Sequence, residues 1–458
     1  MAIETVNPAT GMVVKSFPAL SAAEVEARIA RAHVAFADYR RTTFAQRAAW
    51  MRVAADLLDA EKHDIAATMT LEMGKTRRSA VAEAEKCAKG MRFYAEHAEA
   101  FLADEPLADP AAVGATAARA VYQPLGVVLA VMPWNFPMWQ VVRFLAPALM
   151  AGNVGLLKHA SNVPQCALFL EDLLARAGFP EGVFQSLLIG SGEVESVLRD
   201  PRVAAATVTG SEPAGRAVAA ICGDEVKPTV LELGGSDAFV VMPSADIAKA
   251  AQVAVVARCQ NNGQSCIAAK RFIVHADVYD EFAQHFVDGM SALVVGHPME
   301  DTTDVGPVAT ESGRQDLEEL VEDAVKNGAR VLCGGYAVEG PGWFYPPTVV
   351  ADVTPAMRIH SEEAFGPVAT LYKVPDLDAA IALANATSFG LGSNAWTTDA
   401  AEQERFVAEL EAGAVFINGM TTSYPELPFG GVKRSGYGRE LAAAGIRAFC
   451  NLKTVWVG

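Results

Sequence analysis

The sequence predicts an α/β protein in which parallel sheets are covered by helices. From residue 126 onward, short apolar runs alternate with stretches of helical periodicity, which is typical of such sheets. Polar and glycine-rich turns follow several of these runs, at the strand ends where open parallel sheets bind ligands. The 458-residue chain also exceeds what one hydrophobic core usually supports, so we expect two or three domains.

Composition excludes several classes of function. A net charge of −17 argues against nucleic acid or an anionic membrane as a partner. The seven cysteines are widely spaced without a CxxC pair, and the eight histidines show no metal-ligand spacing, so we expect reduced thiols and no metal site. The first residues lack the layout of a signal peptide, and no apolar run is long enough to cross a bilayer. These features predict a cytoplasmic protein.

The N-terminal quarter of the chain is predicted to be mostly helical. Turn residues within 5–20 predict an extended entry, and Ser21 with Glu24 forms a capping box before apolar residues at helical spacing. Residues 104–123 contain prolines and a glycine before an alternating stretch, which indicates a hairpin leaving the domain. The further helices expected in this block span 42–60, 63–73 and 76–103.

The middle and the end of the chain supply the expected sheets. Strands are predicted over 126–132, 154–158, 183–189, 204–208 and 229–233, with helices over 138–150, 164–177 and 213–221. A second α/β unit is predicted up to about residue 418, with helices near 245–258, 277–294 and 311–328. The last strand is expected over 450–457.

Cys266 and Glu232 are the predicted reactive pair. Cys266 follows Gly263-Gln264-Ser265, a setting in which backbone amides can approach the sulfur and hold the pKa of the thiol below that of a free thiol. Glu232 lies between two leucines and precedes two glycines, and apolar surroundings raise a carboxyl pKa toward the range of a general base. One nucleophile and one base predict an acyl-enzyme that is formed and then hydrolysed.

The segment Pro133-Trp134-Asn135-Phe136-Pro137 is an unusual rigid turn at a strand end. Alone, it would be interpreted as an aromatic turn that packs for stability. Beside a nucleophile, the amide of Asn135 is expected to donate to a developing oxyanion, together with the backbone N–H of Cys266.

Thr209-Gly210-Ser211 followed by Gly215 is a weak signal when it stands alone, since glycine turns before helices are common. Its place in the parallel sheet favours binding of a cofactor pyrophosphate at a helix N-terminus. Glu363, in Glu362-Glu363-Ala364-Phe365, is expected to accept from cofactor ribose hydroxyls, unless the segment is only a surface acidic turn.

Lys158 and Ser161 bear on the choice of cofactor. A site selective for NAD normally places a carboxylate against the ribose 2′-hydroxyl. Ser161 has no charge to repel a 2′-phosphate, and Lys158 is able to pair with one, although a single lysine is by default a solvated one. The pair predicts NADP, with NAD as a poorer alternative.

Several motifs together resemble the aldehyde dehydrogenase superfamily. They are PWNFP, VTGS with a following glycine, LELGG, GQSC, EEAFGPV and PFGGVKRSGYGRE, in family order over essentially the whole chain. LMAGNVGLLKHASNVPQCA and QNNGQSCIAAKRFIVHAD are similar to the short bacterial NADP-dependent succinate-semialdehyde dehydrogenase branch, as is the segment INGMTTSYPELPFGGVKRSGYGREL.

The resemblance implies roles for particular residues. Cys266 would be the nucleophile, Glu232 the base that activates the deacylating water, and Asn135 the oxyanion donor. The cofactor would be held by Trp134, Lys158, Ser161, Gly210, Ser211, Gly215, Leu233, Glu363 and Phe365.

The resemblance also implies a domain plan. A Rossmann-like cofactor domain would comprise 1–107 and 124–230, and an α/β catalytic domain 231–439. A small β oligomerisation element would comprise 108–123 and 440–458, through which the family forms dimers or tetramers.

For the substrate, the resemblance implies oxidation of succinate semialdehyde to succinate. Arg143 and Ser423 match the residues that this branch uses for the substrate carboxylate. Gln260 replaces a second arginine of the longer enzymes, and Ala268 replaces a cysteine able to form a redox disulfide. Two alternatives remain: NADP-dependent oxidation of other small aliphatic aldehydes, and a non-catalytic structural protein on the same fold.

Overall fold

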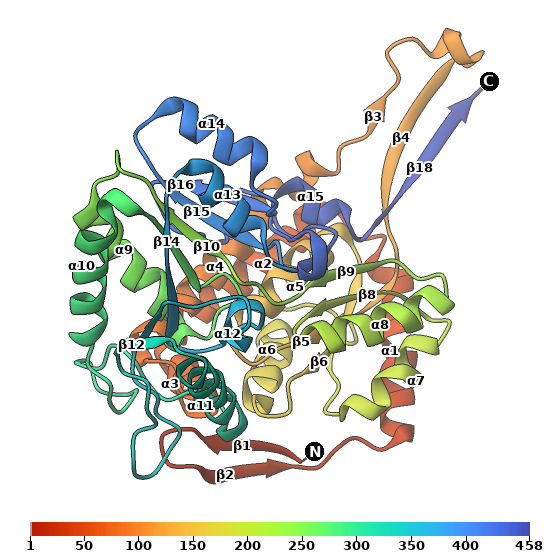
Figure 1. Ribbon diagram of the computed structural model, residues 1–458. Helices are drawn as coiled ribbons and strands as arrows, with labels where there is room; N and C mark the ends of the chain where they lie inside the picture. Colours follow the sequence, from red (N-terminus) through yellow and green to blue (C-terminus); the bar gives the residue numbers. More distant parts are fainter. Residues whose placement is uncertain (1) are drawn as a thin grey trace.

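A computed structural model describes residues 2–458, which form two large sheets covered by helices, a small projecting three-stranded sheet and a two-stranded hairpin near the N-terminus (Figure 1). The first large sheet has the strand order β17-β9-β8-β5-β6-β7. Its strands are β5 (Val127–Met132), β6 (Val154–His159), β7 (Phe184–Ser186), β8 (Val203–Thr209), β9 (Thr229–Glu232) and β17 (Gly436–Tyr437). All neighbours are parallel except β17, which is antiparallel to β9.

The strand order places a binding crevice in this sheet. The chain runs from β5 through β6 to β7 on one side and then returns to the other side of β5 as β8 and β9. The order therefore reverses between β5 and β8, and open parallel sheets bind ligands beyond the carboxyl ends of strands at such a switch point. The turns after β5 and β8 are the two segments Pro133–Pro137 and Gly210-Ser211.

Helices flank this sheet on both faces. The predicted capping box of Ser21 and Glu24 is confirmed, and a second box formed by Thr43 and Gln46 starts α2 at Phe44 rather than at residue 42. The helices are α1 (Ala22–Tyr39), α2 (Phe44–Ala60), α3 (Lys62–Met73), α4 (Arg77–Phe101), α5 (Trp139–Ala151), α6 (Pro164–Arg176), α7 (Val194–Arg199) and α8 (Glu212–Asp224).

Two sequence predictions in this half need correction. Residues 5–20 do not form a simple extended entry, because β1 (Ile3–Asn7) and β2 (Met12–Phe17) pair as an antiparallel hairpin. The strand predicted over 183–189 is limited to β7, since the chain turns back on itself where the N–H of Ile189 donates to the carbonyl of Leu187.

The second large sheet has the order β12-β13-β14-β11-β10-β15-β16. Its strands are β10 (Ala238–Val241), β11 (Arg271–His275), β12 (Arg330–Cys333), β13 (Thr348–Ala351), β14 (Val368–Val374), β15 (Gly392–Trp396) and β16 (Ala414–Ile417). The helices are α9 (Ile247–Cys259), α10 (Tyr279–Ser291), α11 (Glu311–Lys326), α12 (Arg358–Ser361), α13 (Leu377–Asn385) and α14 (Ala400–Glu409). Apolar clusters bury both faces of this sheet, which explains its valine-rich strands.

The small sheet projects from the body as an arm (Figure 1). It consists of β3 (Glu105–Pro106), β4 (Ala117–Pro124) and β18 (Cys450–Val457), and the helix α15 (Ala442–Arg447) precedes β18. The predicted hairpin is present only in part, because β3 has two residues whereas β18 pairs with β4 along eight register positions. The C-terminal strand therefore supplies most of the pairing of β4.

Candidate active site

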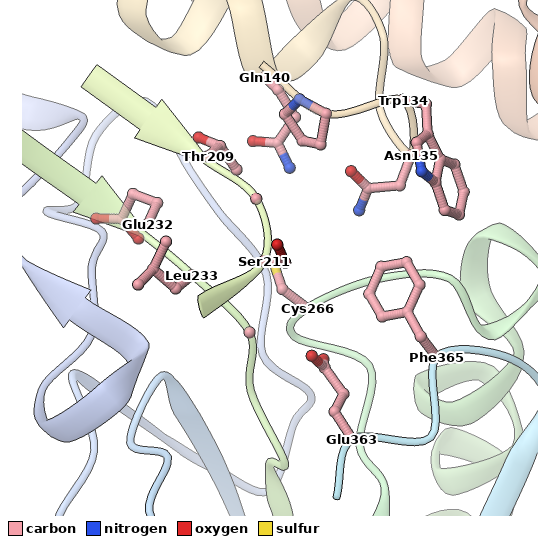
Figure 2. A pocket seen from close by; sticks show the side chains of 13 residues that line it. Trp134, Asn135, Gln140, Thr209, Ser211, Glu232, Leu233, Cys266, Glu363 and Phe365 are labelled. Atoms are coloured by element: carbon pink, nitrogen blue, oxygen red, sulfur yellow. The ribbon is translucent and has the colours of Figure 1, made fainter. Parts of the chain in front are cut away.

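A cavity of about 260 Å³ lies beyond the carboxyl ends of β5, β8 and β9, where loops of the second sheet approach (Figure 2). The cavity is lined by Pro133, Trp134, Asn135, Gln140, Thr209, Gly210, Ser211, Glu232, Leu233, Gly234, Cys266, Glu363 and Phe365. It thus brings together the predicted nucleophile, the predicted base and most of the predicted cofactor residues.

Cys266 stands on a turn with an unusual backbone. Asn261, Asn262 and Gly263 have φ values of 54°, 57° and 73°, so successive residues adopt the left-handed conformation after α9 ends. Asparagine and glycine tolerate that conformation best. A Cβ on Gly263 would lie 2.4 Å from the carbonyl oxygen of Gly366, so glycine is required there. Asn262 donates to the carbonyls of Gly74 and Pro307, which fixes the turn against neighbouring segments.

Lys270 holds the peptide of the cysteine. Its buried ammonium donates to the carbonyl of Ser265 at 3.0 Å and to that of Cys266 at 2.8 Å. It also pairs with the carboxylate of Glu363 at 3.0 Å. Sequence reasoning missed Lys270, although its position four residues after the cysteine could have drawn attention to it. Its contacts link the two loops that carry Cys266 and Glu363.

The pKa of Cys266 differs from the sequence expectation. Burial raises the pKa of this thiol to about 11, and the nearby cations Arg143 and Lys270 offset only part of the rise. The expected lowering of this pKa is therefore wrong. Desolvation by the surrounding protein outweighs the nearby cations, and the guanidinium of Arg143 is already paired with the carboxylate of Glu440.

Asn135 is fixed by its neighbours on both sides. Its side-chain Nδ2 donates to the backbone carbonyl of Gln264 at 3.2 Å, and its backbone carbonyl accepts from the side-chain Nδ2 of Asn261 at 2.7 Å. One of the two N–H groups of the Asn135 amide is thereby used, and the other remains for a ligand in the cavity. The carboxylate of Glu83 accepts from the backbone N–H groups of Met138 and Trp139, which anchors the start of α5 just after this turn.

Glu232 is almost fully buried at the end of β9, with 2% of its surface exposed. Neither of its carboxylate oxygens has a hydrogen-bond partner among residues 2–458. Burial raises its pKa well above the usual value, the nearby carboxylate of Glu440 raises it further, and Arg143 and Arg439 oppose the rise. The predicted direction of this shift is confirmed, and the unpartnered carboxyl is placed to hold or accept a proton.

The cofactor candidates divide into two groups. Trp134, Gly210, Ser211, Leu233, Glu363 and Phe365 line the cavity, and the rings of Trp134 and Phe365 meet edge to face at 5.7 Å. Gly215 lies in α8, where a Cβ would come within 2.5 Å of Leu233, so this glycine allows the helix to pack closely on the strand end.

Lys158 and Ser161 lie outside the lining of the cavity, at the end of β6 and just after it. Burial lowers the pKa of Lys158, and the nearby carboxylate of Glu193 opposes that shift. Ser211 precedes α8 and its side chain makes no capping hydrogen bond there, and a Cβ added at Gly210 would meet no atom within 4 Å.

The substrate candidates Arg143, Ser423 and Gln260 are not among the residues that line the cavity. Arg143 is buried in an ion pair with Glu440 and donates to the hydroxyl of Thr209 at 3.3 Å. Ser423 accepts hydrogen bonds from Lys86 and from the indole of Trp139. Gln260 is half-buried, and its Nε2 has no partner among the described residues.

Sequence reasoning missed several residues of this region. Gln140 lines the cavity beside Thr209, which the predicted Thr209-Gly210-Ser211 motif already contained, and Lys86 reaches Ser423 from a distant helix. Gln140 lies three residues after the Pro133–Pro137 turn, in the first turn of α5, and this closeness to the candidate turn was a usable signal. Nothing in the sequence placed Lys86 near Ser423.

Residues 2–458 contain no helix that is both long and apolar enough to cross a membrane, and no cluster of side chains suited to a metal ion.

Comparisons with known proteins agree with this geometry. A family model described as "Aldehyde dehydrogenase family" matches residues 1–455. The chain is 68% identical over 459 residues to a "Succinate-semialdehyde dehydrogenase [NADP(+)]" of Mycobacterium avium (strain 104), covering 100% of this chain and 97% of that protein. It is 67% identical over 457 residues to "Succinate-semialdehyde dehydrogenase [NADP(+)] 1" of Mycobacterium tuberculosis (strain ATCC 25618 / H37Rv), with 100% of both chains covered.

Among solved structures, the chain is similar to the succinic semialdehyde dehydrogenase from Streptococcus pyogenes in complex with NADP+ as the cofactor. The TM-score is 0.96 at 35% identity, and the match covers 100% of both chains. The expected aldehyde dehydrogenase fold is confirmed.

The raised pKa of Cys266 predicts a steep pH dependence of its alkylation without cofactor. Because only the thiolate reacts and its fraction grows tenfold per pH unit below the pKa, the rate should rise about 100-fold between pH 7 and 9. The measurement is the rate of iodoacetamide labelling of the Cys266 peptide by mass spectrometry. Cys266→Ala identifies the peptide, and a plateau below pH 8 would contradict the burial argument.

Proposed function

The chain belongs to the aldehyde dehydrogenase family, and we propose that it oxidises succinate semialdehyde to succinate with NADP as the hydride acceptor. The observation that carries the proposal is the meeting of Cys266, Asn135 and Glu232 in one cavity. The names of the two mycobacterial relatives, which match over the whole chain, support the choice of substrate and cofactor.

In the first half of the reaction, the thiol of Cys266 loses its proton to solvent and its thiolate forms a bond to the aldehyde carbon, while the electron pair of the C=O bond moves onto oxygen. The free N–H of Asn135 and the backbone N–H of Cys266 are the donors for this oxyanion, and one such donor is typically worth roughly 10²–10³ in rate. When bound, the nicotinamide supplies a hydride acceptor. Loss of the hydride from the same carbon leaves a thioester on Cys266.

In the second half, Glu232 takes a proton from a water molecule as its oxygen attacks the thioester carbon. The C–S bond then breaks, the carboxylic acid leaves, and Cys266 is restored as a thiolate. The raised pKa of Glu232 suits this task, because a base whose pKa lies nearer neutrality accepts a proton more readily. The presence of this base favours hydrolysis over transfer of the acyl group to coenzyme A.

The proposed dinucleotide site joins the switch-point crevice to the cavity. Ser211 at the start of α8 would hold the pyrophosphate, Trp134 and Phe365 would flank the nicotinamide end, and Glu363 would accept from its ribose. Lys158 would pair with the 2′-phosphate, since Ser161 offers no negative charge to repel it.

Two alternatives have different support. Oxidation of uncharged small aldehydes is favoured by Gln260 and by the ion pair that occupies Arg143, since both reduce the positive charge available to a substrate. A non-catalytic structural role is disfavoured, because the nucleophile and the base are both present and share the cavity.

We also propose that the arm formed by β3, β4 and β18 is the oligomerisation element of a homodimer or homotetramer, in the domain plan expected from the sequence. In this sheet β18 is an edge strand, and its Leu452 and Trp456 are 55% and 54% exposed. An exposed edge with apolar side chains favours pairing with another chain. We expect the assembly to be cytoplasmic.

Glu232→Gln should leave acylation intact and slow deacylation. We expect a burst of NADPH close to one equivalent per active site, followed by turnover reduced about 100-fold or more, since a positioned base typically contributes 10²–10⁴. Stopped-flow absorbance at the NADPH band measures both phases. Cys266→Ala, which removes the nucleophile, should show neither burst nor turnover, and unchanged steady turnover in Glu232→Gln would refute the role of this base.

Lys158→Met should weaken the preference for NADP. Loss of a charge-assisted contact should lower kcat/KM with NADP about 10-fold while leaving that with NAD nearly unchanged. Ser161→Glu is the matched variant, because a carboxylate there should repel the 2′-phosphate and favour NAD. Steady-state rates with both cofactors test this, and a preference of the unmodified enzyme for NAD would overturn the assignment.

A further inference from the structure

Lys86 contacts Trp139 and Ser423 and belongs to no part of the mechanism above. It projects from α4, is half-buried, and places its ammonium 4.6 Å from the ring centre of Trp139. Its Nζ donates to the hydroxyl oxygen of Ser423 at 2.8 Å. The indole N–H of Trp139 donates to the same oxygen at 2.9 Å.

These contacts fix the direction of the Ser423 hydroxyl. An ammonium and an indole N–H are donors only, so the oxygen of Ser423 must accept from both and its two lone pairs are used. The O–H of Ser423 is then left as a donor, and the described residues offer it no acceptor. Lys86 also keeps ammonium N–H bonds beyond the one given to Ser423. The cluster therefore presents several donors and no acceptor, which is the pattern that suits an anion.

The charge of Lys86 is not neutralised by the protein. No carboxylate of residues 2–458 forms an ion pair with it, whereas Lys75 on the loop before α4 pairs with Glu83, and Arg143 pairs with Glu440. Partly burying an ammonium without a counter-charge is costly. A cation that is kept in such a position commonly serves a ligand of opposite charge.

The cluster adjoins the cavity that holds Cys266. Trp139 and Gln140 are the first two residues of α5, and Gln140 lines the cavity, with its amide directed into it (Figure 2). The Oε1 of Gln140 has no partner among the described residues. Lys86 and Ser423 are thus joined through Trp139 to the helix whose next residue, Gln140, lines the cavity, although neither of them lines it.

We propose that Lys86 acts with Ser423 as the subsite that binds the carboxylate of the aldehyde substrate. Lys86 supplies the second cation that Gln260 does not, and it does so from a different element of the fold. The inference rests on the proposed function in that the substrate is an aldehyde with a carboxylate at its far end. It makes Lys86 a determinant of specificity rather than a catalytic residue.

The surroundings of Lys86 support a dependence on pH. Burial lowers the pKa of Lys86 to about 8, and the cations Arg143 and Lys75 add to the lowering, while Cys87 and Glu83 oppose it. Above pH 8 the free enzyme therefore loses this positive charge. Affinity for a carboxylate should weaken with rising pH in that range, and affinity for an uncharged aldehyde should not.

The test compares Lys86→Met and Lys86→Arg with Lys89→Met, which removes a surface lysine of the same helix paired with Glu426. Succinate semialdehyde and butanal are the substrates, because they share a four-carbon chain and differ in the carboxylate. Lys86→Met should raise KM for succinate semialdehyde about 10- to 100-fold, with kcat for butanal changed less than about 2-fold. Lys86→Arg should restore much of the affinity, and Lys89→Met should match the unmodified enzyme.

Equal losses with both substrates in Lys86→Met, or no loss with either, would overturn the proposal. The pH arm gives a further readout: KM for succinate semialdehyde should rise above pH 8 in the unmodified enzyme and stay flat in Lys86→Arg, whose guanidinium remains charged. The same pH profile in both proteins would also count against Lys86.

A separate arm distinguishes this inference from the proposed function. Succinate is tested as an inhibitor of butanal oxidation, which needs no assumption about the natural substrate. A Ki for succinate that is at least 10-fold higher in Lys86→Met than in the unmodified enzyme supports the anion subsite. If the unmodified enzyme does not prefer succinate semialdehyde over butanal, only the proposed substrate is refuted. An unchanged Ki would refute the subsite itself.

Discussion

The ion pair between Lys270 and Glu363 is the interaction on which the site depends most. The same ammonium binds the carbonyls of Ser265 and Cys266, so one buried charge joins the cysteine loop to the segment that carries Phe365. Buried charges are tolerated where they are paired and hydrogen-bonded. Because the left-handed turn at Asn261–Gly263 leaves the loop few alternatives, this contact and that turn together set where the sulfur stands.

Around that loop, burial rather than charge decides the protonation states. The carboxyl of Glu232 and the thiol of Cys266 both have raised pKa values, and in both cases desolvation is the larger cause. Arg143 lies near both groups, but its pairing with Glu440 limits its effect. Burial therefore disfavours the charged forms of both reactive groups, the thiolate of Cys266 and the carboxylate of Glu232.

Much of the fold and the centre of the site were predictable from the sequence. Apolar runs and helical periodicity gave most elements of the first sheet, and the motif order identified Cys266, Glu232 and Asn135, which the structure brings into one cavity. The pairing of β18 with β4 could not be predicted from sequence patterns, because two strands far apart in the chain carry no local signal of which strand each one pairs with. Lys86 and Lys270 were missed for a related reason: a lysine is by default solvated, and only the fold shows what it contacts.

The central claim is that Cys266 carries the acyl group and Glu232 drives its hydrolysis. The most direct measurement is peptide mass spectrometry of Glu232→Gln, quenched in acid after brief mixing with NADP and succinate semialdehyde. The account predicts a succinyl group on the peptide that contains Cys266, absent when NADP is omitted, because the thioester forms only after hydride transfer. A succinyl group on another residue, or an unmodified Cys266 despite NADPH formation, would contradict it.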